Sequence, residues 1–72
     1  MDGVALRNAL AYVILLGQDG LLTEAEEQKL VAKLSGGDAA LLTATAAYST
    51  VADARGDARQ RAARVLTRLA HN

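Results

Sequence analysis

The residues that most often carry catalysis are few in this chain and stand far apart. The sequence has no cysteine, and its one histidine, His71, is next to the last residue, where chain ends usually fray. Ser35 and Ser49 have no histidine nearby in sequence to act as a general base. The three glutamates within residues 24–27 are explained by a helix start, where carboxylates complement the helix dipole. We therefore predict that the chain is not an enzyme and has no catalytic residue, cofactor or small-molecule substrate.

A second pattern with chemical meaning runs from residue 15 to residue 26. Its later half resembles the calcium-binding loop of EF-hand proteins, because Asp19, Gly20 and Glu26 stand at the fifth, sixth and twelfth loop positions. The earlier half departs from that loop, since Leu15 and Gly17 occupy the first and third positions, where carboxylates bind the ion. A turn followed by a helix cap explains the same residues. We predict no metal site, and a degenerate EF-hand-like domain stays open as an alternative.

Three arginines form a basic stripe near the end of the chain. Arg61, Arg64 and Arg68 are one to two helical turns apart, and guanidinium groups bind carboxylates and phosphates through paired hydrogen bonds. Against nucleic acid stand a formal net charge of zero and the lack of an aromatic residue within the stripe. A solvated helix face would explain the stripe equally well. The candidates are thus an acidic protein partner, a nucleic acid as the alternative, or no ligand.

The composition predicts that helices position these groups. Alanine and leucine are the commonest residues, proline is absent, and Tyr12 and Tyr48 are the only aromatic residues. Alanine and leucine favour helix strongly, so we expect an aliphatic core. The 72 residues contain no linker or repeat and are predicted to form a single small helical domain over 1–72. A chain of this size buries only about 60% of its unfolded surface, so its stability should be marginal.

The spacing of apolar residues predicts an all-α bundle of about four short helices. Their predicted ranges are 3–17, 24–34, 39–54 and 58–70. Gly17 is expected to end the first helix, and Thr23 with Glu26 forms a capping box for the second. Asp38 caps the third, and Asp57 begins the fourth. In the second helix, we expect Glu26, Lys29 and Lys33 to share the solvent face.

The first helix is apolar on two sides. One side is the expected core face, with Leu6, Ala9, Leu10, Val13, Ile14 and Leu16. A second stripe consists of Val4, Ala11 and Leu15, with Tyr12 beside it. A helix that is apolar nearly all round is either central in a bundle or shared with a partner. The stripe either packs inside the bundle or forms a dimer seam or groove.

We therefore predict a non-catalytic helical module for protein–protein interaction, an adaptor or dimerisation domain. Its candidate partner-binding residues are Val4, Ala11, Tyr12, Leu15, Arg61, Arg64 and Arg68. The expected partner is another protein or a second copy of the chain. We also expect a cytoplasmic location and no membrane partner, because the longest apolar run, Ala9–Leu16, is far shorter than the roughly 20 residues of a membrane span and lacks a preceding basic segment.

Overall fold

The computed structural model describes residues 3–49 and 56–71, and all regular structure within these ranges is helical. The four helices are α1 (Gly3–Gln18), α2 (Glu24–Ser35), α3 (Ala39–Ser49) and α4 (Gly56–Ala70). The predicted all-α bundle of four short helices is confirmed. The first two helices each extend one residue beyond their predicted ends.

The later two helices depart more from the predicted ranges. Helix α4 begins at Gly56, two residues before the predicted start, so Asp57 lies in its first turn. A carboxylate in that turn still complements the helix dipole. The predicted residues 50–54 of the third helix lie outside the described residues.

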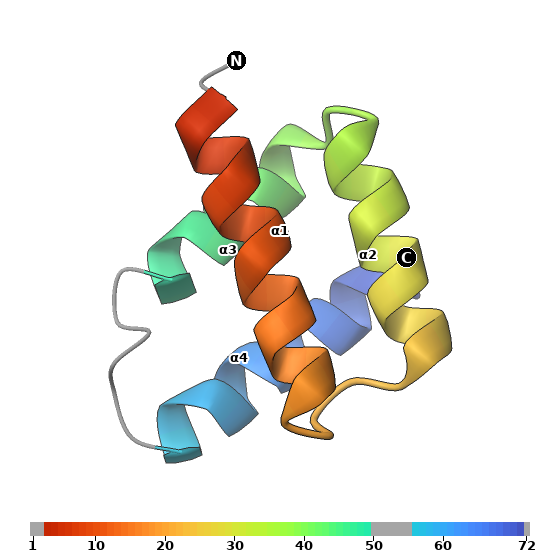
Figure 1. Cartoon of the computed structure of the whole chain (residues 1–72), viewed down its shortest axis with the longest axis vertical. Helices are drawn as coiled ribbons and strands as arrows, with labels where there is room; N and C mark the ends of the chain where they lie inside the picture. The colour runs from red at the N-terminus through yellow and green to blue at the C-terminus, as the bar shows by residue number, and fades with distance from the viewer. Residues whose placement is uncertain (1–2, 50–55, 72) are drawn as a thin grey trace.

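The helices pack as a front pair and a rear pair. Figure 1 shows α1 and α2 side by side and running in opposite directions, with α3 and α4 crossing behind them. Helix α1 packs on α2 and α3, and α4 packs on the same two helices. No other helix is drawn in front of α1 in this view. Within residues 3–49 and 56–71, one side of α1 is therefore left without a neighbouring helix.

All four helices contribute to an aliphatic core. The largest fully buried side chains are Val13 and Leu16 of α1, Leu30 and Leu34 of α2, Leu41 and Thr45 of α3, and Leu66 of α4. Thr45 is polar, but its hydroxyl donates a 2.7 Å hydrogen bond to the carbonyl of Leu41 in the preceding turn. This bond satisfies the buried hydroxyl without any partner from another helix.

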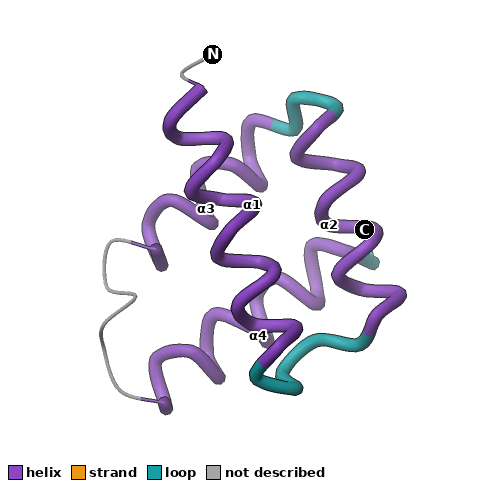
Figure 2. The backbone as a smooth tube through the Cα atoms, viewed as in Figure 1, coloured by secondary structure: helices purple, strands orange, loops and turns teal. Residues whose placement is uncertain are grey.

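Two glycines in left-handed conformation end α1 and α2, and the turns that follow are short (Figure 2). Gly20 has a φ of 76° and Gly37 a φ of 86°, values that favour glycine because it has no Cβ. In each case the amides of the glycine and of the next residue bond back to carbonyls in the last turn, which is a Schellman motif. The predicted stop at Gly17 is therefore wrong.

Gly17 instead lies inside α1 and permits a close approach. A Cβ at this position would clash with the carboxylate of Glu27 in the first turn of α2. Glycine thus leaves room for the end of the flexible Glu27 side chain against the last turn of α1.

The predicted capping box at the start of α2 is present. The backbone amide of Glu26 donates to the Thr23 hydroxyl at 3.1 Å, and the Thr23 amide donates to the Glu26 carboxylate at 2.8 Å. Asp38 caps α3 as predicted, because its carboxylate accepts the amide of Leu41 at 2.9 Å. These bonds satisfy amides that have no partner within their own helices.

Polar contacts between distant parts of the chain hold α4 in place. Arg59 forms an ion pair with Asp19 at 2.8 Å, which joins α4 to the α1–α2 turn. The Lys33 ammonium donates a 2.8 Å hydrogen bond to the carbonyl of Leu69 in the last turn of α4. Lys33 is therefore half-buried against α4, and its predicted place on the solvent face is wrong.

We expect Thr23→Ala to lower the free energy of unfolding by about 1 kcal/mol, because it removes the hydroxyl of the capping box. Thr43→Ala is the matched control, since Thr43 is exposed within α3 and should change stability by less than about 0.5 kcal/mol. Urea denaturation followed by circular dichroism measures both. Equal losses in the two variants would show that the cap contributes nothing of its own.

Candidate functional site

The side of α1 that lacks a neighbouring helix presents an exposed stripe. Its members are Val4, Arg7, Ala11, Ile14 and Gln18, all exposed. Successive members follow one another at steps of three, four, three and four positions, which is the spacing of a helix–helix seam in coiled coils. We call this set the α1 stripe.

Large apolar side chains occupy two positions of the α1 stripe. Val4 is 61% exposed and Ile14 is 45% exposed, and they are the exposed large hydrophobic residues among those the structure describes. A shallow groove of about 410 Å³ lies beside the α1 stripe and includes Ile14 but not Val4 in its lining. It is lined by Gly3, Leu6, Arg7, Leu10, Ala11 and Ile14. Arg7 is the only charged residue of this lining.

The four candidate residues predicted on the first helix differ in how exposed they are. Val4 and Ala11 are exposed, whereas Leu15 is half-buried against the core and Tyr12 is only 5% exposed. Val4 and Leu15 point in nearly the same direction, but they lie at opposite ends of α1. The chain folds back around the Leu15 end through the turn into α2, whereas Val4, near the start of α1, is 61% exposed.

Ile14 is the residue of this surface that the sequence reasoning assigned to the core. Its apolar side chain and its spacing from Leu10 suggested an inward position, but the structure exposes it. The signal that identifies it is its position three residues after Ala11 and seven residues after Arg7, both of which are also exposed.

Tyr12 belongs to a partly polar cluster at the edge of the core. Burial raises the pKa of its phenol, the nearby Arg59 guanidinium opposes that rise, and Tyr48 adds to it. The three residues come from α1, α4 and α3. Tyr12 thus helps to join three helices and is not part of the exposed face of α1.

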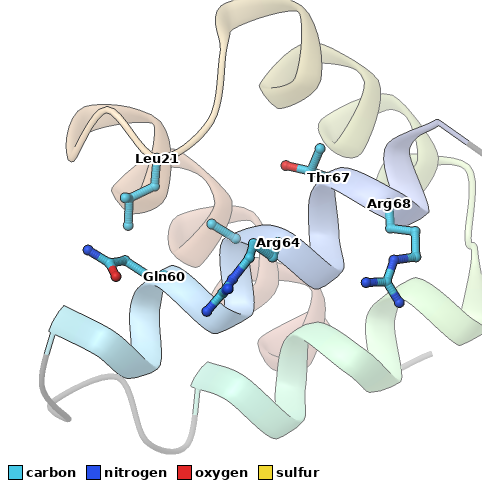
Figure 3. Close-up of a pocket in the computed structure, with 6 residues that line it drawn as sticks. Leu21, Gln60, Arg64, Thr67 and Arg68 are labelled. Atoms are coloured by element: carbon cyan, nitrogen blue, oxygen red, sulfur yellow. The ribbon is translucent and has the colours of Figure 1, made fainter.

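The arginine stripe lies on α4, with Arg61, Arg64 and Arg68 all exposed. Two of the three border a groove of about 640 Å³, shown in Figure 3. The groove is lined by Leu21, Gln60, Ala63, Arg64, Thr67 and Arg68. We call it the α4 groove. Arg61 is not among its lining residues.

The segment that resembles a calcium loop forms a helix end, a turn and a cap. Asp19 pairs with Arg59, and Glu26 accepts the Thr23 amide and lies 3.4 Å from Nε2 of His71. Among residues 3–49 and 56–71, no group of three or more histidine, aspartate or glutamate side chains is placed to hold a metal ion. The carboxylates that would bind calcium have protein partners instead.

These contacts also stabilise the ionised form of Glu26. Hydrogen bonds from Thr23, the backbone one foremost, lower the pKa of the Glu26 carboxyl, with smaller contributions from His71 and Thr67, while burial opposes the shift. The His71 amide bonds to the carbonyls of Thr67 and Arg68. His71 is therefore held to the end of α4, contrary to the expected fraying.

Of the potential catalytic groups, His71 and Ser35 lie near opposite ends of α2. The His71 side chain is 57% exposed and lies beside Glu26, while Ser35 is exposed at the end of α2. The side chain of Ser49 lies outside the described residues.

Of the described helices, none is long and apolar enough to cross a membrane.

Comparisons with known proteins were made at the levels of family, sequence and structure. No protein-family model, curated protein or solved structure matches the chain.

We expect calcium at about 1 mM to leave the circular dichroism spectrum unchanged and to give no binding heat by calorimetry, because two of the required carboxylates are missing from the loop. A saturable heat would contradict this prediction. If that heat disappeared in Asp19→Asn, it would assign a calcium site to the α1–α2 turn.

Proposed function

We propose that this chain is a non-catalytic helical interaction module of the cytoplasm that associates with a second copy of itself through the α1 stripe. The observation that carries the proposal is the exposure of Val4 and Ile14 at helix-pairing spacing on the side of α1 that no other helix covers. Removing apolar surface from water is favourable by roughly 25 cal/mol per Å², and the entropy lost on association offsets part of this gain.

The shape of the α1 stripe suits a partner helix. Ala11 lies between Val4 and Ile14, and its small side chain allows a second helix to approach closely at the middle of the stripe. The groove beside it is lined mainly by apolar residues. A helix with the same apolar spacing would bury Val4 and Ile14 together, which is how amphipathic helices dock into grooves.

A second copy provides such a helix. In a two-fold dimer the same patch serves both partners, and the formal net charge of zero gives little electrostatic repulsion between copies. A parallel pairing would place two Arg7 side chains together. An antiparallel pairing centred between Leu10 and Ala11 instead places Arg7 opposite Ile14 of the second copy, where its aliphatic stem can cover the isoleucine while its charge reaches water.

Two adjacent residues offer a matched test. We expect Ile14→Glu to abolish self-association while changing the free energy of unfolding by less than about 1 kcal/mol, because Ile14 is exposed. We expect Leu15→Glu to lower that free energy by about 2 kcal/mol or more, because it places a charge against the core. Sedimentation equilibrium and urea denaturation measure the two effects.

The sedimentation result distinguishes a second copy of the chain from other partners. A wild-type chain that stays monomeric at every concentration would contradict self-association and favour docking of another protein's amphipathic helix on the same stripe. A dimer that Ile14→Glu leaves intact would place the interface elsewhere on the molecule.

A further inference from the structure

The α4 groove combines an apolar floor with a cationic rim. Leu21, from the turn after α1, is half-buried, and Ala63 of α4 is only 4% exposed. Arg64 and Arg68 are exposed at the rim, and Figure 3 shows their guanidinium groups extending from α4. The volume of about 640 Å³ lies within the range of about 300–1,000 Å³ typical of ligand sites.

The charge of the lining indicates the chemistry of a ligand. Gln60 and Thr67 are neutral, so both charged residues of the lining are arginines and no acidic residue belongs to it. An arginine guanidinium binds a carboxylate through two parallel hydrogen bonds. A complementary ligand would therefore carry negative charge beside an apolar group.

We infer that the α4 groove binds an acidic amphipathic segment of a partner protein. An apolar side chain of that segment lies against Leu21 and Ala63, and its carboxylates pair with Arg64 and Arg68. This surface is separate from the α1 stripe, so the inference does not depend on self-association.

A helical segment can match the spacing of the two arginines. Four residues of α helix correspond to an axial rise of about 6 Å, so acids three or four residues apart on a helix lying along α4 match Arg64 and Arg68. Arg61 lies one turn earlier and outside the lining. Its contribution should therefore be small.

The same lining argues against a nucleic acid. None of its residues is aromatic, so the groove offers no ring on which a base could stack.

The inference can be tested by selecting, from a displayed library of random peptides, those that bind the folded wild-type chain. Each peptide has about 16 residues, which is long enough for four helical turns. We expect the enriched peptides to carry a large apolar residue with aspartate or glutamate three or four positions away. Fluorescence anisotropy then measures the affinity of the most enriched peptide and of its twin with glutamine in place of each acid.

The variants Arg64→Gln/Arg68→Gln and Arg61→Gln form a matched comparison on one exposed helix. We expect the double variant to weaken binding about tenfold, which is the size expected for two solvent-exposed ion pairs. Arg61→Gln should change affinity less than about twofold. Thermal melts followed by circular dichroism check that both variants stay folded.

Any of three results would overturn the inference: the selection enriches no peptide, the enriched peptides lack acidic residues, or Arg61→Gln weakens binding as much as the double variant does. A DNA or RNA oligonucleotide that binds more tightly than the enriched peptide, with all three arginines contributing equally, would assign the surface to nucleic acid instead.

Discussion

Helix α1 carries apolar side chains on more sides than the other three helices of this short chain can cover. Its inner side, with Val13 and Leu16 fully buried, provides the surface on which α2 and α3 pack. Once those contacts are made, α4 lies behind the pair and cannot also cover the front (Figure 1). Val4 and Ile14 remain in water. The exposed α1 stripe is thus a consequence of how the core is built.

The fold was largely predictable because its signals are local. The Thr23–Glu26 capping box and the Asp38 cap need only residues within one turn, and they begin α2 and α3 where expected. The helix ends were less predictable. Residue type alone does not distinguish Gly17 from Gly20 as the stop, and it is Gly20 that adopts the left-handed conformation of the Schellman motif.

The candidate site was predicted only in part, for the same reason. Helical periodicity identifies apolar stripes, but it does not say which one faces the core, so Ile14 was assigned inward and Tyr12 outward. The actual orientation of α1 depends on neighbours far away in sequence, such as Tyr48 and Arg59 near Tyr12. Likewise, the arginine stripe was visible in the sequence, whereas the groove that Leu21 forms beside Arg64 required the fold.

The central claim is that the Ile14 side of α1 is a free surface that pairs with a second copy. Ile14 is the only isoleucine in the sequence, so a sample labelled at isoleucine δ1 methyl groups gives one NMR signal from within that surface. Between about 10 μM and about 1 mM protein, the range of a weak dimer, we predict that this signal shifts and shows intermolecular contacts in a mixture of labelled and unlabelled chains. A signal that neither shifts nor shows such contacts would contradict the account.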